Sequence, residues 1–136
     1  MSEDIATSKV ITAVGRRKTA VASVKLLSGS GKVLVNNKSL DSYFAGLIRL
    51  QQVVLMPLNA VKASTQYDVF ATVRGGGVMA QAEAVRHGIA RILASINTKF
   101  KVVVKKEGYL TRDDRMVERK KPGKAKARKS FQWTKR

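Results

Sequence analysis

Residues 67–96 read YDVFATVRGGGVMAQAEAVRHGIARILASI, and this stretch indicates the fold more clearly than any other. Apolar side chains occupy every second position from Tyr67 to Val73, which is typical of a strand with one buried face. Gly75 to Gly77 follow, and apolar residues then recur every three or four positions, which predicts an amphipathic helix. The core-facing residues predicted for this helix are Val78, Ala82, Val85, Ile89, Leu93 and Ile96.

Two more strands are expected before this unit. Ala20, Ala22, Val24 and Leu26 alternate with the polar residues Thr19, Ser23 and Lys25, and residues 33–35 form a second apolar run. Between them lies the sequence SGSG at residues 28–31, whose small and flexible residues are typical of a tight turn. The pattern therefore predicts a hairpin in which these two strands pair with each other.

Helices are expected over residues 40–44 and 47–58, ahead of the strand that begins at Tyr67. Residues 101–106 allow two interpretations, because a run of three valines favours a strand whereas a short surface helix is also compatible. Together these patterns predict an α/β domain with strands and helices around one sheet. A chain of 136 residues has room for one such core and an appended arm.

The composition points to a polyanionic partner. Lys and Arg total 27 against 9 Asp and Glu, which gives a net charge of +18 and a pI near 10.8. Such a charge is typical of proteins that bind nucleic acid or an anionic membrane. The longest apolar run, Val53 to Met56, is far shorter than the roughly 20 residues of a membrane-spanning helix, so nucleic acid is favoured. The absence of cysteine excludes disulfides and thiolate metal sites.

Positive charge is concentrated in a C-terminal tail. Within residues 119–136, nine of eighteen residues are Lys or Arg and none is acidic. Mutual repulsion and a shortage of apolar groups predict an extended segment when this tail is alone. Its reach would be roughly 60 Å, against a radius near 13 Å for a domain of about 100 residues. Phe131 and Trp133 share one side of an extended chain, where they can stack on bases or fill a crevice.

The glycines raise the possibility of a nucleotide site, because Gly75, Gly77 and Ala80 fit the spacing G-x-G-x-x-G/A. The context argues against a dinucleotide, since residues 95–106 contain no acid to hold a ribose and the strand comes late in the chain. Two interpretations stay open. The glycines let a phosphate approach the exposed N–H groups at a helix start, or they form a purely structural tight turn.

No catalytic set can be assembled from the sequence. His87 is the single histidine and has no carboxylate cluster or thiol to work with, so a surface contact is expected of it. Asp113 and Asp114 are flanked by Arg112 and Arg115, which favours ion pairs or a turn. We therefore expect no enzyme activity, no cofactor and no metal site. Three consecutive cations at residues 16–18 cannot all face a core, and in so basic a chain a phosphate contact is favoured.

Five ordered blocks resemble the family of the ninth small-subunit ribosomal protein, in its bacterial or organellar form, over nearly the whole chain from Val14 onward. The most specific block is GGGVMAQAEAVRHGIARIL at residues 75–93. Ile92 and residues 130–134 depart from the usual pattern, and residues 1–10 match no part of it. The other blocks are GRRKTAVASV at residues 15–24, SLDSYF at 39–44, LTRD at 110–113 and ERKKPG at 118–123.

The resemblance implies an α+β two-layer fold like the second domain of the fifth small-subunit protein, with a left-handed βαβ crossover. A variable N-terminal extension would cover residues 1–10, a globular rRNA-binding domain residues 11–110, and an extended basic tail residues 111–136. Lys135 and Arg136 would approach the anticodon stem-loop of the peptidyl-site tRNA. The residues implied to bind rRNA are Arg16, Arg17, Lys18, Gly75, Gly76, Gly77, Arg112, Arg115, Arg119, Lys120, Lys121, Lys124, Lys126, Arg128 and Lys129.

The same resemblance implies a place in the head of the small ribosomal subunit of a bacterium or an organelle. The partners would be the 3′ major domain of the small-subunit rRNA and the seventh, tenth and fourteenth proteins of that subunit, with no membrane. Two other functions remain as alternatives. One is a free-standing nucleic-acid binder, such as a regulator or nucleoid protein, and the other is an enzyme with a phosphate ligand at the glycine turn.

Overall fold

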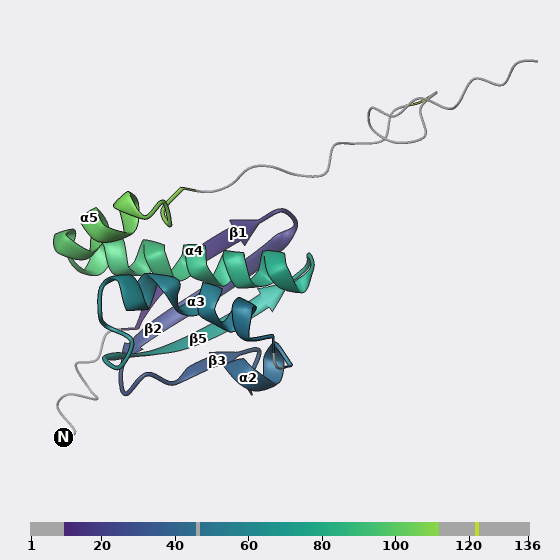
Figure 1. The fold of residues 1–136 in the computed structure, drawn as a ribbon, viewed down its shortest axis with the longest axis horizontal. Coiled ribbons are helices and arrows are strands. Elements are labelled where there is room, and N and C mark those ends of the chain that lie inside the picture. The colour runs from purple at the N-terminus through teal and green to yellow at the C-terminus, as the bar shows by residue number, and fades with distance from the viewer. Residues whose placement is uncertain (1–9, 46, 112–121, 123–136) are drawn as a thin grey trace, which may run out of the picture.

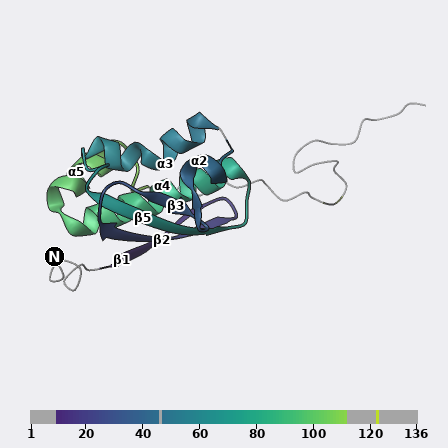
Figure 2. The same ribbon diagram turned by 90° about the horizontal axis from the view of Figure 1, so that it is seen from below.

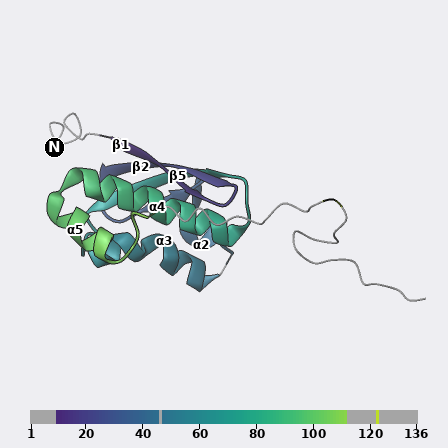
Figure 3. The ribbon, with the colours of Figure 1, turned by 90° about the horizontal axis from the view of Figure 1, so that it is seen from above.

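The computed structural model describes residues 10–45, 47–111 and 122. In chain order its elements are β1 (Ile11–Arg17), β2 (Ala20–Ser28), β3 (Val33–Val35), β4 (Lys38–Ser39), α2 (Leu40–Tyr43), α3 (Ile48–Ala60), β5 (Tyr67–Arg74), α4 (Val78–Ile96) and α5 (Thr98–Lys106) (Figure 1). Within the described residues, α3 and α4 cover one face of a five-stranded mixed sheet, as the views in Figures 2 and 3 agree. The result is an α+β domain of two layers.

The sheet order β1-β2-β5-β3-β4 corrects the predicted hairpin. β2 pairs antiparallel with β1 and with β5, and it does not pair with β3. β3 pairs in parallel with β5, with Val33 opposite Val69 and Val35 opposite Ala71. The last strand in the sequence is thus inserted between the two strands expected to form the hairpin. β3, the helices α2 and α3, and β5 together form a βαβ unit.

The loop between β2 and β3 explains why the hairpin prediction is wrong. Asp68 in β5 accepts hydrogen bonds through Oδ1 from the N–H groups of Ser30, Gly31 and Lys32, at 3.0, 3.1 and 2.9 Å. The loop therefore wraps around the start of β5 instead of closing a two-stranded turn. The hydrogen bond from the Lys32 N–H is the main cause that lowers the pKa of Asp68 below its ordinary value of 3.8, against a smaller opposing effect of burial.

The periodic stretches of sequence fold as predicted. Ala20, Ala22, Val24 and Leu26 are buried in the sheet, and so are the alternate residues of β5 from Val69 to Val73. α4 occupies the predicted helix, and its buried side includes Val85, Ile89 and Leu93. Val78 is 50% exposed, so the apolar stripe of the helix begins later than its period suggests.

Facing glycines allow α4 to lie directly on β1. Sequence patterning does not single out β1 as a strand, yet it holds the buried Gly15 under the helix. A Cβ added at Gly15 would lie 1.9 Å from the carbonyl oxygen of Ala84 and 2.4 Å from the nitrogen of Gly88. One added at Gly88 would lie 2.6 Å from Cγ2 of Val24. These small residues therefore set the spacing between the two layers.

Helix α5 decides between the two interpretations of the valine run. The side chain of Asn97 caps the helix by accepting a hydrogen bond from the Lys99 N–H at 2.9 Å. Val104 is fully buried, whereas Val102 is 68% exposed. Two residues that differ so much in burial while two positions apart are typical of a helix, because a strand would place them on the same face.

Candidate nucleic-acid interface

The turn between β1 and β2 presents the three predicted cations in different directions. Side chains alternate along β1, so Arg16 lies on the face opposite to the buried Gly15. Arg16 and Lys18 are exposed. Arg17 lies on the helix side, where its Nε donates to Oε2 of Glu83 at 2.6 Å, and the two side chains are 13% and 19% exposed. The expectation that not all three cations face a core is confirmed, while Arg17 has a partner within the domain.

Glu83 is a residue that the sequence interpretation missed. It is the one acid between Asp68 and Glu107 in a strongly basic chain. An isolated acid on the predicted helix was the available signal for an ion pair. The choice of Arg17 over its neighbours could not be foreseen, because it depends on which face of β1 packs under α4.

The glycine loop packs on the β1–β2 turn. Gly75 and Gly76 have φ values of +73° and +67°, a left-handed conformation that glycine adopts without strain. A Cβ at Gly75 would lie 2.6 Å from the carbonyl oxygen of Thr19, and one at Gly76 would lie 3.0 Å from the nitrogen of Ala20. The tight-turn interpretation therefore accounts for both glycines. Two segments far apart in sequence meet at this end of the sheet.

Gly77 differs from its two neighbours. It is the N-cap of α4 with φ of −86°, which any residue adopts, and a Cβ there would meet nothing within 4 Å. No side chain caps this end of α4, and no acid lies in its first turn. Neither backbone strain nor crowding within the described residues requires glycine here. The helix start is thus open to an approaching group, and its N–H groups and dipole favour an anion.

A chain of hydrogen bonds fixes the loop from the other side. Asn36 Nδ2 donates to the Tyr43 hydroxyl oxygen at 3.5 Å, and that hydroxyl donates to Gln81 Oε1 at 2.6 Å. Gln81 Nε2 then donates to the carbonyl oxygen of Gly75 at 3.1 Å. Tyr43 and Gln81 belong to two separate blocks of the family resemblance, SLDSYF and the glycine block. Sequence interpretation did not assign them a shared role, because only the fold brings them together.

Asn36 also continues the sheet with its side chain. Its Nδ2 donates to the Val73 carbonyl oxygen at 3.1 Å, and its Oδ1 accepts from the Val73 N–H at 2.8 Å. The residue has a φ of +51°, which asparagine tolerates better than most residues. Asn36 therefore satisfies the N–H and the carbonyl group of Val73, just before the glycine loop begins.

His87 connects α4 to β1 and to the end of the domain. Its Nδ1 accepts the Arg16 N–H at 3.4 Å, and its Nε2 lies 3.3 Å from the carbonyl oxygen of Leu110. With Nδ1 as acceptor, Nε2 carries the proton and donates to Leu110. The side chain is half-buried. This corrects the expectation of a surface contact, since His87 holds the chain next to the predicted start of the tail.

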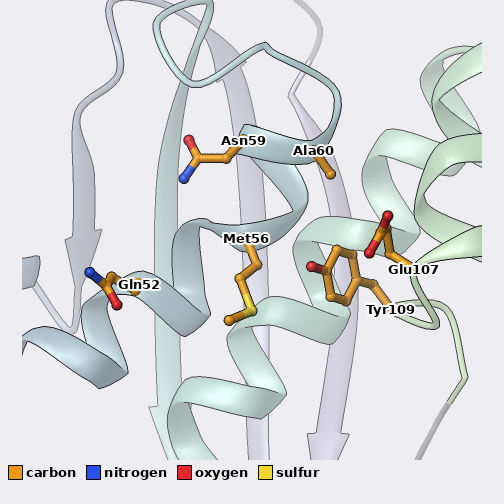
Figure 4. Close-up of a pocket in the computed structure, with 6 residues that line it drawn as sticks. All are labelled: Gln52, Met56, Asn59, Ala60, Glu107 and Tyr109. Atoms are coloured by element: carbon orange, nitrogen blue, oxygen red, sulfur yellow. The ribbon is translucent and has the colours of Figure 1, made fainter.

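A cavity of about 520 Å³ separates the end of α3 from the segment that follows α5 (Figure 4). Figure 4 shows Tyr109 and Glu107 on one side facing Met56 on the other. The guanidinium of Arg86 lies 5.5 Å from the centroid of the Tyr109 ring and its Nη1 lies 3.9 Å from Met56 Sδ. The exposed carboxylate of Glu107 makes this cavity unsuited to a phosphate. The full lining is Gln52, Met56, Asn59, Ala60, Glu107 and Tyr109.

The other predicted binding residues lie outside the described part of the chain. They comprise most of the cationic segment and the aromatic residues Phe131 and Trp133, and the pair Asp113 and Asp114, expected to form ion pairs or a turn, also lies outside. The predicted rRNA- and tRNA-binding residues among them are Arg112, Arg115, Arg119, Lys120, Lys121, Lys124, Lys126, Arg128, Lys129, Lys135 and Arg136.

The described residues define a class of protein before any comparison. They form a basic α+β domain in which an exposed cationic turn adjoins a glycine loop and an open helix start. Among these residues, no group of three or more His, Cys, Asp or Glu is placed to hold a metal ion. None of the helices they form is long and apolar enough to cross a membrane.

Comparison with known proteins gives the family. A family model described as ribosomal protein S9/S16 matches residues 15–136. The small ribosomal subunit protein uS9 of Azobacteroides pseudotrichonymphae is 54% identical over 128 residues, which cover 94% of this chain and 99% of that protein. Proteins of the same name in Amoebophilus asiaticus and Cytophaga hutchinsonii are 52% identical over 130 residues and 53% identical over 128 residues, with the same coverage.

The chain belongs to the ribosomal protein S9/S16 family. It is a structural, non-enzymatic protein of the small ribosomal subunit that acts in translation, and RNA binding is typical of its family. The three relatives named above are bacterial. The family resemblance drawn from the sequence and the expectation of a non-enzyme are thereby confirmed.

Proposed function

We propose that this chain sits in the head of the small ribosomal subunit, where it binds and braces the 3′ major domain of the rRNA. The chain belongs to a family of ribosomal proteins, and one observation of its structure supports the proposal. The β1–β2 turn lies against the glycine loop. Exposed Arg16, Lys18 and Arg74 and the open start of α4 consequently share one end of the domain. Glu83, the acid on the same helix, is neutralised by Arg17. Such an end suits the phosphates of a folded RNA.

Gly77 favours the phosphate interpretation of the loop over the purely structural one. The turn and the close approach to Thr19 explain Gly75 and Gly76, so these two glycines do not distinguish the interpretations. Neither a left-handed turn nor a close approach requires glycine at position 77, and serine or aspartate would cap the helix better. A residue without a side chain at this position leaves room for an RNA backbone to reach the N–H groups of the first turn.

The test compares Gly77→Asp with Gly77→Ser. Both replacements supply a capping side chain. The free energy of unfolding should therefore change by only a few tenths of a kcal/mol, or increase. The aspartate also places a negative charge where the phosphate would bind, so rRNA affinity should fall about tenfold or more. Gln52→Glu on the exposed face of α3 is the matched control, because it makes the same charge change on another helix, at a residue that lines the cavity of Glu107 and Tyr109. Equal affinities for Gly77→Asp and Gln52→Glu would leave only the tight-turn role.

The fold, boundaries and neighbours follow from the same family membership. The βαβ unit of β3 and β5 is the element in which we propose the left-handed crossover of the fifth protein's second domain. Residues 11–110 would be the globular rRNA-binding domain, with a variable extension at residues 1–10 and a basic tail at residues 111–136. The seventh, tenth and fourteenth proteins of the subunit would be its neighbours. The bacterial relatives support a ribosome in the bacterial cytoplasm over one in an organelle.

The C-terminal cations complete the proposed rRNA contacts. Arg112, Arg115 and the cations from Arg119 to Lys129 would anchor in rRNA together with Arg16 to Lys18 and the glycine loop. If six or more phosphates are met, affinity for the matching rRNA should fall about a thousandfold or more between about 50 and 200 mM salt, by analogy with DNA. An affinity that does not respond to salt would contradict this assignment.

Lys135 and Arg136 are proposed to reach the anticodon stem-loop of the peptidyl-site tRNA. Removing these two residues should leave subunit assembly largely intact while weakening tRNA binding in the peptidyl site or start-site fidelity. Removing residues 119–136 should also harm assembly, because rRNA contacts are lost with them. Filter binding of tRNA to reconstituted subunits measures the first effect, and unchanged affinity after the short truncation would refute the tRNA role.

Sedimentation distinguishes this function from that of a free-standing nucleic-acid binder. A structural constituent follows the small subunit through a gradient at high salt, because many phosphate contacts and buried surfaces must dissociate together. A regulator or nucleoid protein would stay at the top of the same gradient. The third possibility, an enzyme at the glycine turn, is excluded by the family.

A further inference from the structure

A second cavity lies between α4 and α5, apart from the glycine loop. Its volume is about 360 Å³. It is lined by Arg91, Ala94 and Ser95 from α4, Lys101 from α5, and Leu110. Two cations from different helices therefore line one cavity, and no carboxylate is among the lining residues. No residue of this cavity was predicted to bind RNA.

The acids of the described residues are placed elsewhere. Glu83 is paired with Arg17, and the Oδ1 of Asp68 accepts three backbone N–H groups. Glu107 lines the larger cavity shown in Figure 4. The two cavities near the end of the domain thus differ in chemistry, because one has a carboxylate and the other has an arginine and a lysine. Only the second suits an anion.

Arg91 is held in position for a ligand. Its Nη1 donates to the carbonyl oxygen of Val14 in β1 at 2.6 Å. A guanidinium has five N–H donors in a planar fork, so this one bond fixes the group and leaves other donors for an incoming phosphate. Less side-chain freedom is then lost on binding than for an unrestrained arginine.

Ser95 adds a feature that favours RNA over a small anion. Its hydroxyl donates to the carbonyl oxygen of Ile92 at 2.7 Å, so its proton is engaged within α4. The hydroxyl oxygen can still accept a hydrogen bond, and a ribose 2′-hydroxyl can donate one. Phosphate and ribose are adjacent in an RNA backbone, as are the cations and this acceptor in the cavity lining.

We infer that the cavity between α4 and α5 binds a backbone phosphate of the small-subunit rRNA, held by Arg91 and Lys101. The inference rests on the proposed rRNA-binding function and adds a contact on a different side of the domain from the glycine loop. Leu110 lines the cavity, and its carbonyl oxygen is hydrogen-bonded to Nε2 of His87. A phosphate bound here lies next to Leu110, and Arg112 and Arg115 follow within five residues in sequence.

The test replaces Lys101 with glutamine in the full chain. Lys99→Gln is the matched control, because Lys99 is exposed on the same helix, loses the same charge and does not line the cavity. Lys101→Gln should lower affinity for the rRNA on the order of tenfold near 0.1 M salt and reduce the slope of log K against log salt by about 0.7 to 0.9. The control should change both quantities much less. Both variants should unfold at the temperature of the parent protein.

Ethylation interference identifies the phosphate itself. In complexes of the parent protein and of Lys99→Gln, one rRNA phosphate should weaken binding when it is ethylated, and that signal should disappear with Lys101→Gln. Inorganic phosphate at millimolar concentration should not abolish the difference in rRNA affinity between Lys99→Gln and Lys101→Gln. If the parent protein fails to bind rRNA, the proposed function itself fails. If it binds rRNA but the two variants behave alike, or if inorganic phosphate competes fully, the rRNA contact at this cavity is overturned.

Discussion

Replacing Gly15 with alanine should separate the two layers of the domain. The added Cβ would lie 1.9 Å from the carbonyl oxygen of Ala84 and 2.4 Å from the nitrogen of Gly88. Restoring an ordinary contact distance requires α4 and β1 to move apart by about 1.5 Å. Both obstacles are backbone atoms of a helix, which cannot rotate away as a side chain can.

The cost of this substitution should be large compared with the stability of the protein. Overfilling a packed core costs about 1 to 3 kcal/mol, and the rigidity of the obstacle places Gly15→Ala at about 3 kcal/mol or above. A domain of this size is stable by only about 5 to 15 kcal/mol. Urea unfolding followed by circular dichroism should show a midpoint lowered by roughly 1 to 3 M. Gly77→Ala is the control, because its Cβ meets nothing within 4 Å, and only a weaker helix cap is expected there.

A companion variant tests the reasoning about rigid and movable obstacles. At Gly88 the nearest atom to an added Cβ is Cγ2 of Val24, a side-chain atom. Gly88→Ala should therefore be destabilising alone and partly rescued by Val24→Ala, whereas no side-chain truncation should rescue Gly15→Ala. A loss below about 1 kcal/mol for Gly15→Ala, with an unchanged slope of unfolding free energy against urea, would show that the layers adjust easily and would refute the packing argument.

Substitutions at three further positions test the polar contacts. Asn36→Ala should cost about 2 to 4 kcal/mol in urea unfolding, since it leaves the N–H and carbonyl groups of Val73 without their side-chain partners. Asn36→Gly should regain only the part of this loss that comes from backbone strain at positive φ. Asp68→Asn should cost about 1 kcal/mol at neutral pH. Because the folded pKa of Asp68 is below 3.8, its contribution is present above that pH and lost as pH falls through the lower value, so the variant should flatten the acid limb of the stability curve. Glu83→Gln should cost about 1 kcal/mol by thermal melting yet strengthen rRNA binding at low salt, because it removes a negative charge beside the cationic turn. Weaker binding would mean that the ion pair positions the turn.

The C-terminal segment carries most of the predicted rRNA and tRNA contacts, and experiments on the protein should therefore concentrate on it. Its cations were predicted as rRNA and tRNA contacts, and they lie outside the described residues. Leu110, which precedes this segment in the sequence, is held within the described residues by the hydrogen bond to His87. The Lys101→Gln variant therefore tests a contact beside Leu110 without altering the sequence of the segment.

Local periodicity correctly predicted the elements that bury one face. Residues 20–26, β5 and α4 each bury most of the alternate or helically spaced residues that their patterns indicated, because burial of one face leaves a regular trace in the sequence. Charge counting likewise pointed to nucleic acid, since net charge does not depend on how the chain folds. The candidate site was predicted in part, as the cationic turn and the glycines are contiguous motifs.

Tertiary structure alone decided which strands pair and which polar groups meet. β5 inserts between β2 and β3 because the carboxylate of Asp68 holds the intervening loop, and no local pattern reports an interaction that spans 36 to 38 residues. The valine run became a helix because Asn97 caps it and only Val104 reaches the core. The packing of α4 on β1 brings Arg17 into an ion pair with Glu83 and places Gly15 against Gly88. The sequence by itself determined the family, the charge and the periodic elements, while contacts between distant residues required the folded chain because their energy depends on positions that only the fold specifies.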